Sequence, residues 1–255
     1  MVRAKSRCGN SASICLTGPV SGDPKSMVPT WLLVLSWTAL AVAVLCAAWL
    51  AFDIYGRGYR PPMAIMGVVW PVTALYFGPL AVWSYRRWGR PNSERWQREY
   101  EREPAEPPRW VPPALGTSHC GAGCTLGDII AEFGVFLLGV TLAGSTLLAE
   151  YVGDFVLALL LGIVFQYLAI APMRGLGLRK GLVQAAKADV LSLTSFEIGL
   201  FGWMALMSFV FFPEPHLHPD HVTYWFLMQI GMIIGFLTSY PVNVWLIRKG
   251  IKERM

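Results

Sequence analysis

Apolar residues along the chain fall into six blocks, each about 20 residues long, separated by polar or charged segments. A block of that length crosses the roughly 30 Å hydrocarbon core of a bilayer as an α-helix. Backbone groups in lipid must pair internally, and the alternation typical of a membrane β-barrel is absent from the sequence. The pattern predicts an all-α membrane protein with six transmembrane helices in three hairpins, at residues 29–52, 64–85, 126–148, 152–173, 190–212 and 223–246.

Basic residues beside these blocks distinguish the two sides of the predicted protein. Arg and Lys follow the second, fourth and sixth blocks, whereas the segments after the third and fifth blocks contain neither. Loops rich in Arg and Lys stay in the cytoplasm. We therefore expect a multi-pass protein of a bacterial or archaeal cytoplasmic (inner) membrane with both termini cytoplasmic, against which only Arg57 and Arg60 count. The net charge of +5 reflects these flanking residues and does not indicate a nucleic-acid partner.

Composition also divides the chain into parts. Before Met27 the sequence is polar and lacks the apolar stretch of a secretory signal peptide, so it is interpreted as a disordered tail or a wrongly assigned start. Farther along, Asn92-Ser93 is placed to cap a short interfacial helix that carries Trp96 and Tyr100. The predicted parts are a tail (1–26), an N-terminal transmembrane hairpin (27–88), a cytoplasmic or interfacial linker (89–116) and a four-helix membrane domain (117–255).

Two patterns recur in the predicted helices. The pattern Leu-x3-Pro-x6 followed by two basic residues occurs at 75–87, 168–180 and 237–249, and Glu-x-Gly-x-Phe begins at Glu132 and Glu197. We interpret the third to sixth helices as a duplicated hairpin, with the first two helices as a diverged copy. The alternative is that positive-inside selection and ordinary membrane prolines produce the pattern without duplication.

The repeat suggests a site at one depth in the membrane. Glu132 and Glu197 each lie seven residues, or about 10 Å, inside their predicted helices. Each repeated proline, at a similar depth, frees the carbonyl four residues earlier, such as that of Leu75. Glu132 and Glu197 are therefore predicted to form a cation or proton relay in the inner leaflet. The alternative is a packing kink whose glutamates are protonated or hydrogen-bonded between helices.

The segment His119-Cys120-Gly121-Ala122-Gly123-Cys124 precedes the third apolar block. Thr125-x-x-Asp128 resembles a capping box, so the glycines are predicted to form a turn before the helix. Thiolates and imidazole suit Zn²⁺ or Cu⁺, so a copper or zinc ion is predicted at His119, Cys120 and Cys124, with Asp128 as a further ligand. A redox-active thiol pair and a purely structural turn are the alternatives.

Three histidines, His216, His218 and His221, lie in the segment between the last two blocks. Together with nearby carboxylates they could capture metal ions from outside the cell. The alternative is a polar loop stiffened by proline. The chain has four histidines, so this division suggests capture outside and release to thiolates inside.

No catalytic motif stands out in the sequence. It contains no His-Glu-x-x-His, Gly-x-Ser-x-Gly, phosphate loop or dinucleotide fingerprint. No catalytic residue is therefore assigned, and an enzyme is disfavoured.

Ser118–Asp128 resembles the signature of a prokaryotic membrane family known only as domain of unknown function 4396. Phe196–Met204 and Ser239–Ile247 are similar to its other hallmarks, and the resemblance covers about residues 117–255. The resemblance implies the fold and a membrane location but no chemistry.

Together these observations lead to one functional hypothesis. The chain is predicted to lie in the lipid bilayer and to bind or transport a transition-metal cation, with no identified protein partner. The alternative is a non-catalytic membrane scaffold or a thiol redox sensor.

Overall fold

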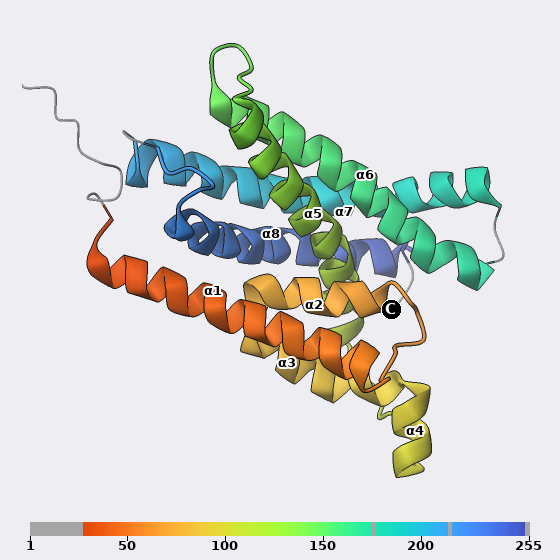
Figure 1. Cartoon of the computed structure of the whole chain (residues 1–255). Helices are drawn as coiled ribbons and strands as arrows, with labels where there is room; N and C mark the ends of the chain where they lie inside the picture. Colours follow the sequence, from red (N-terminus) through yellow and green to blue (C-terminus); the bar gives the residue numbers. More distant parts are fainter. Residues whose placement is uncertain (1–27, 175–176, 214–215, 253–255) are drawn as a thin grey trace, which may run out of the picture.

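The computed structural model describes residues 28–174, 177–213 and 216–252, and the predictions about residues 1–26 lie outside this part. Regular structure in the described residues is helical, apart from one isolated bridge between Leu142 and Ser145. This confirms the all-α membrane fold. The elements, seen in Figure 1, are α1 (Thr30–Ala51), η2 (Phe52–Gly56), α2 (Met66–Phe77), α3 (Pro79–Ser84), η3 (Tyr85–Gly89), η4 (Arg90–Asn92), α4 (Glu94–Tyr100), α5 (Val111–Leu138), α6 (Thr146–Arg174), α7 (Leu178–Leu206), η5 (Met207–Phe211) and α8 (Val222–Arg248).

Five of the described helices are long and apolar enough to cross a membrane, so the predicted count of six is not confirmed. Their apolar segments alone are 23 residues or longer, against 12 residues in α2. At 1.5 Å per residue, α2 covers only about 18 Å of a core roughly 30 Å thick. The spans are Thr30–Gly56, Val111–Leu138, Thr146–Ala169, Asp189–Phe211 and Val222–Arg248.

The second predicted helix is instead a re-entrant hairpin, α2–α3. The chain reverses at Gly78, whose φ of 53° is in the left-handed region that favours glycine, and Pro79 begins α3. After the reversal Tyr85 packs against Trp70, with ring centroids 5.5 Å apart, and its hydroxyl bonds Asp53 at 3.0 Å. The hairpin therefore enters the bundle and returns to the side from which it came, so it is not a third copy of a two-span hairpin.

The bundle has two ends, which we call the loop end (residues 139–145, 212–213 and 216–221) and the linker end (residues 57–65, 86–110, 177–188 and 249–252). The start of α1 lies at the loop end, where Ser36 bonds Thr223 at 3.3 Å, whereas Arg248 ends α8 at the linker end. In Figure 1 the loop end lies at the upper left, with the turn between α5 and α6 at the top, and α4 of the linker end lies at the lower right. The two described extremities therefore lie at opposite ends of the bundle, whereas the position of both termini on one side of the membrane stays a prediction.

Within the described residues, this topology also removes the conflict in the charge pattern. The segment that contains Arg57 and Arg60 packs on α4, where the hydroxyl of Tyr59 bonds Glu99 at 2.6 Å. Both arginines thus share the linker end with the other basic residues of the described part, and the loops at the opposite end contain neither Arg nor Lys. By the positive-inside rule, the linker end is the one expected to face the cytoplasm.

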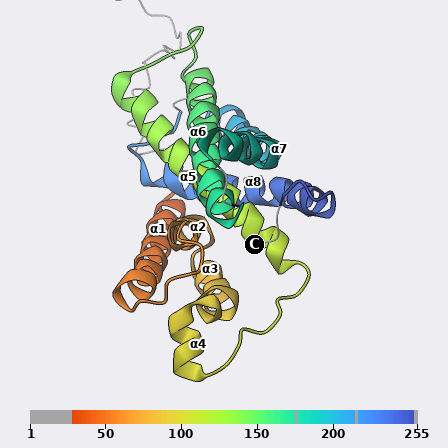
Figure 2. The same ribbon diagram turned by 90° about the vertical axis from the view of Figure 1, so that its right-hand side faces the viewer.

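The linker between the hairpin and α5 is shorter than predicted. It contains α4, whose N-cap Ser93 accepts a hydrogen bond from the backbone N–H of Trp96 at 3.3 Å, as the sequence predicts. It ends at residue 110, because α5 already begins at Val111. Figure 2 shows this segment passing from α4 to the start of α5 along the side of the bundle.

Helix α5 is the central element. In its most apolar window 56% of residues are buried inside the protein, against 11% in α1. It packs on α6 so closely that a Cβ atom added to Gly127 would lie 2.5 Å from the backbone nitrogen of Ala158. A Cβ added to Gly123 would meet Gly162 at 3.0 Å, so small residues set this contact on both helices.

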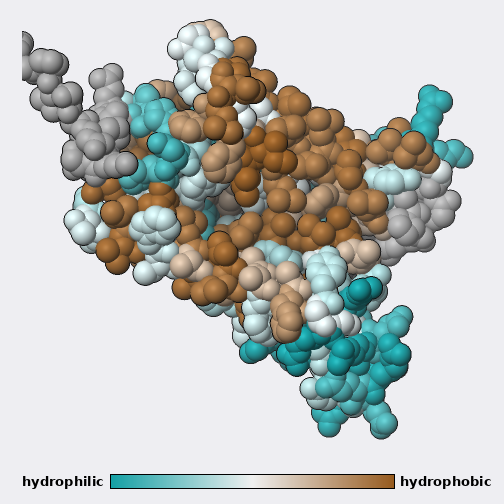
Figure 3. Space-filling model, in the orientation of Figure 1, coloured by the Kyte–Doolittle hydropathy of each residue, from teal (hydrophilic) through white to brown (hydrophobic). Residues whose placement is uncertain are grey.

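The distribution of hydrophobic residues on the surface agrees with a membrane protein. Figure 3 shows hydrophobic residues covering the middle of the molecule and hydrophilic residues over α4 at its lower right. Exposed apolar side chains such as Leu45, Leu138 and Ile198 belong to the five long helices and suit contact with lipid.

Candidate functional site

The structure places His119–Cys124 inside α5, so the predicted glycine turn is wrong. Thr125 does not cap the helix; its hydroxyl donates to the carbonyl oxygen of Gly121 one turn earlier, at 2.7 Å. The reason is that the glycines provide close helix contact instead of a turn. Gly123 allows α6 to approach closely. A Cβ atom at Gly121 would lie 3.0 Å from the hydroxyl of Tyr76.

The two thiols lie on one face of α5. Cys120 and Cys124 are one turn apart, fully buried and not joined in a disulfide. The thiol of Cys124 lies beside the carboxyl group of Glu197, and Cys120 lies beside Asp189, both on α7. Tyr76, near the tip of the re-entrant hairpin, lies close to both thiols.

His119 points elsewhere. Its imidazole is buried against Phe165 of α6, with ring centroids 6.1 Å apart. Successive residues of an α-helix are about 100° apart around its axis, so a continuous α5 separates His119 from Cys120. Among the described residues, no group of three or more His, Cys, Asp or Glu side chains is arranged to hold a metal ion. His119, Cys120, Cys124 and Asp128 therefore do not form one ligand set in this conformation.

Four buried carboxyl groups form what we call the acidic cluster: Asp128, Glu132, Asp154 and Glu197. Each is at most 1% exposed. They come from three helices, α5, α6 and α7, and lie close enough for their charges to interact. None of their carboxyl oxygens has a hydrogen-bond partner with normal geometry within the described part of the chain.

The two predicted relay residues therefore lie in one cluster. Glu132 lies seven residues before Gly139, where α5 ends, so it is close to the loop end, and it is farther from the helix start than predicted because α5 begins 15 residues before residue 126. Glu197 lies eight residues after Asp189, where its apolar span begins, close to the predicted seven. The position of both groups in the inner leaflet stays a prediction.

The predicted free carbonyl of Leu75 is found, but a side chain uses it. The amide of Gln229 on α8 donates to this carbonyl oxygen at 2.6 Å. The bond ties the tip of the re-entrant hairpin to the four-helix bundle. This carbonyl is therefore a structural contact and not part of a cation site.

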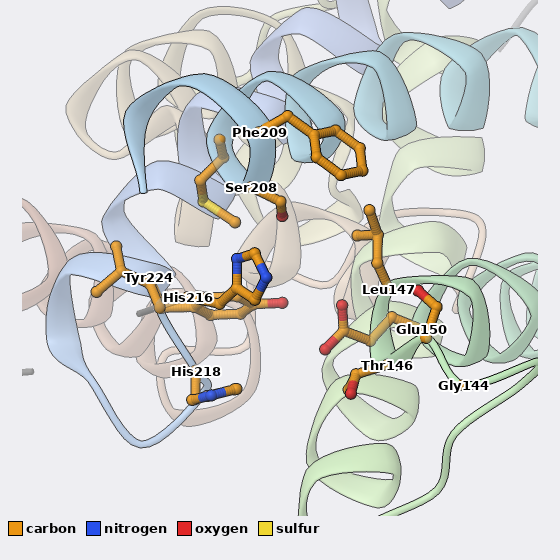
Figure 4. Close-up of a pocket in the computed structure, with 12 residues that line it drawn as sticks. Gly144, Thr146, Leu147, Glu150, Ser208, Phe209, His216, His218 and Tyr224 are labelled. Atoms are coloured by element: carbon orange, nitrogen blue, oxygen red, sulfur yellow. The ribbon is translucent and has the colours of Figure 1, made fainter. Parts of the chain in front are cut away.

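A pocket of about 260 Å³ opens at the loop end. In Figure 4, the carboxyl group of Glu150 and the imidazole of His216 point into it from opposite sides. His218 also lines the pocket, whereas His221 caps α8 and accepts a hydrogen bond from the backbone N–H of Thr223 at 3.2 Å. Two of the three predicted outer histidines thus share a pocket, and the third has a structural role.

The pocket leads to the acidic cluster. Glu150 is close enough to interact with both His216 and Glu132. Tyr224 lines the pocket, and its buried hydroxyl lies beside Glu132. Polar groups therefore continue from the loop end into the core of the bundle.

At the linker end the polar groups are paired. The ammonium group of Lys252 is buried, 3.4 Å from a carboxylate oxygen of Asp189 and 3.3 Å from the carbonyl oxygen of Gly116. Next to them, the amide of Asn243 donates to the hydroxyl of Ser192 at 2.6 Å. We call the full series from pocket to ion pair the polar row: His216, Glu150, Tyr224, Glu132, Asp154, Asp128, Glu197, Cys124, Cys120, Asp189 and Lys252.

Several members of this row were not predicted from the sequence. Asp154 stands alone in the fourth apolar block, and a lone carboxyl group in a membrane helix is itself a sign of a functional site. Glu150 precedes that block and gave no such sign. Lys252 lies in a basic tail, where nothing in the sequence distinguishes it from its neighbours.

Comparisons with known proteins give one match. The model of a family described as "Domain of unknown function (DUF4396)" matches residues 109–252, which include α5–α8 and every residue of the polar row. No curated protein and no solved structure gives a match. Because the matched region covers more than half of the chain, the protein belongs to the DUF4396 family.

Proposed function

We propose that α5–α8 transport a cation across the membrane along the polar row. The observation that carries this proposal is the acidic cluster. Four carboxyl groups in a protein interior cannot all be ionised without counter-charge, because burying an unpaired charge is very costly. Protons or a passing cation must therefore balance them, and in a bilayer such groups mark ion pathways.

No basic side chain of the described residues supplies that charge. Ion pairs in this part of the chain leave the acidic cluster out, and the buried Lys252 pairs with Asp189 instead. The described polar neighbours of the cluster are not basic either. Glu132 lies beside another carboxyl group, Asp154, and beside the hydroxyl of Tyr224, whereas Glu197 lies beside the thiol of Cys124.

The two thiols favour a transition-metal cation, a copper or zinc ion, as the cargo. Cys120 and Cys124 lie one turn apart beside Glu197, so a moving cation that leaves the cluster next meets two sulfur atoms. Thiolates select soft metals, whereas a path for protons alone has no need of them. Glu150, His216 and His218 would capture the ion at the loop end, and Glu132 and Glu197 would relay it or a coupled proton.

The test is flux into proteoliposomes that contain the full chain, with a Cu- or Zn-sensitive dye and a pH-sensitive dye inside. We expect Glu132→Gln to abolish metal flux without changing the melting temperature. The matched control is Glu103→Gln, because Glu103 is an exposed carboxylate of the linker. Equal flux in wild type and Glu132→Gln would overturn the relay.

A double variant tests the identity of the transported ion separately from the transport path. Cys120→Ser combined with Cys124→Ser should abolish metal flux, and purified protein should lose bound metal in the same variant. If the double variant moves protons normally and the wild type moves no metal, the path stands and the metal assignment fails.

The competing function is a membrane scaffold or a thiol redox sensor. The observation that favours it is the pair of adjacent free thiols close to Tyr76. It predicts a folded protein that moves neither metal nor protons, with thiols that oxidise to a disulfide under mild oxidant.

A further inference from the structure

An apolar cleft separates the re-entrant hairpin from α5 and α8. Its volume is about 420 Å³, and its lining is almost entirely hydrophobic. The residues that matter for its shape are Trp70, Phe77, Leu80, Ala114, Phe236 and Leu237. Leu80 and Leu237 are 53% and 63% exposed, so the cleft opens sideways, where the bilayer would lie.

Three tryptophans form the mouth of the cleft at the linker end. Trp88 lies between Trp83 and Trp110, with ring centroids 4.9 Å apart in both pairs and nearly perpendicular planes. All three line the cleft. Tryptophans gather at the boundary between hydrocarbon and headgroups, so this mouth marks the interface.

A polar groove continues from the same mouth. It is lined by Arg109 and Arg248, with one carboxylate, Glu106, and it shares Trp110 and Tyr240 with the apolar cleft. A basic groove joined to an apolar cleft at an interfacial tryptophan matches a molecule with an anionic head and a hydrocarbon tail. Arginine binds phosphate through parallel hydrogen bonds, which favours a phosphate head.

We propose that this composite cleft binds an anionic phospholipid, with the phosphate between Arg109 and Arg248 and one acyl chain in the tryptophan-lined cleft. The linker end is the basic end of the molecule, which the positive-inside rule places at the cytoplasmic leaflet, where anionic lipids attract basic residues. The bound lipid joins the re-entrant hairpin to α5 and α8. This site does not depend on the proposed transport function.

The test uses fluorescence quenching in detergent by phospholipids with brominated acyl chains. The full-length wild type is titrated with brominated phosphatidylglycerol and, separately, with brominated phosphatidylcholine. Two arginines should give a clear preference for the anionic lipid, roughly fivefold per arginine. Equal quenching by the two lipids would overturn the proposal.

Variants test the binding of the lipid headgroup separately from the binding of the acyl chain. Arg109→Gln combined with Arg248→Gln should remove the preference, whereas Arg179→Gln combined with Lys180→Gln, exposed at the same end but outside the groove, should keep it. Ala114→Phe fills the cleft and should remove quenching by phosphatidylglycerol while the protein stays monodisperse. If Ala114→Phe changes only the particle mass, the cleft is a contact between two copies and the lipid site is wrong.

Discussion

The two ends of the polar row solve the same electrostatic problem in different ways. At the linker end, one buried carboxylate, Asp189, faces one buried ammonium group, Lys252, at 3.4 Å. Toward the loop end, four buried carboxyl groups share a cluster without a basic side chain among the described residues. One end is closed by an internal ion pair, and the other depends on protons or ions from outside the protein.

The two ends of the polar row therefore differ in what they can bind. A carboxylate that is already paired is not available to a cation, whereas the buried carboxyl groups without a basic partner are those that the proposed function assigns to a cation or its protons. The pocket with Glu150 and His216 lies beside the unpaired cluster, so the end that can accept a cation is also the end that has an opening. The following predictions test this contrast.

The largest expected effect is on the side of the membrane from which each segment can be labelled. In a cysteine-free background, Arg60→Cys and Arg102→Cys should react with a membrane-impermeant maleimide from the same side of the membrane, because α2–α3 is re-entrant. Thr141→Cys should react only from the opposite side. Six crossing helices would instead place Arg60 and Arg102 on opposite sides, and that labelling pattern would refute the hairpin.

The second effect is the loss of the ion pair. Asp189→Asn leaves the ammonium group of Lys252 buried without its partner and should lower the free energy of unfolding by about 3 kcal/mol. Adding Lys252→Met should restore most of the loss. Both are measured by denaturation in detergent, and a double variant no more stable than the single one would show that the pair does not account for the loss.

The third prediction concerns an Asp→Asn substitution in the acidic cluster. Asp128→Asn removes a buried group whose charged form has no counter-charge, so it should leave the free energy of unfolding unchanged or raise it by up to about 1 kcal/mol. Measured in the same way as Asp189→Asn, Asp128→Asn should show no loss of stability. A loss equal to that of Asp189→Asn would mean that the two ends are alike.

The smallest effect concerns the hairpin tip, which lies between the two ends. Gln229→Leu removes the bond to the carbonyl oxygen of Leu75, worth about 0.5–1.5 kcal/mol, and should speed maleimide labelling of Cys120 and Cys124 by about two- to tenfold. Labelling is followed by mass spectrometry of the peptide that contains both. The matched control is Gln184→Leu, at an exposed position of α7, and an equal acceleration there would point to general loosening.

The sequence predicts the apolar segments well, because the length of a membrane helix is set by the bilayer. Cys124, Asp128 and Glu132 share a face of α5, since residues four apart in a helix are neighbours, and all three are buried. The proposed duplication of the last two hairpins stays a prediction.

Two errors share one physical cause, the ambiguity of glycine. In Gly121-Ala122-Gly123, glycine allows close packing of α5, although the same residues are typical of turns. At Gly78-Pro79 the opposite error occurs. The sequence predicts a proline kink within one helix, but the chain reverses its direction completely there. Only the position of Arg57 and Arg60 pointed to the reversal, since two arginines on the outer side violate the positive-inside rule.

The close contact between α5 and α6 constrains how the protein can move. Where backbones touch at Gly127 and Ala158, neither helix can rotate or slide past the other without a clash. These two helices therefore behave as one rigid body that carries three of the four acidic groups. In the proposed transport function, an opening toward either face of the membrane is therefore expected from movement of α7, α8 and the re-entrant hairpin against this body.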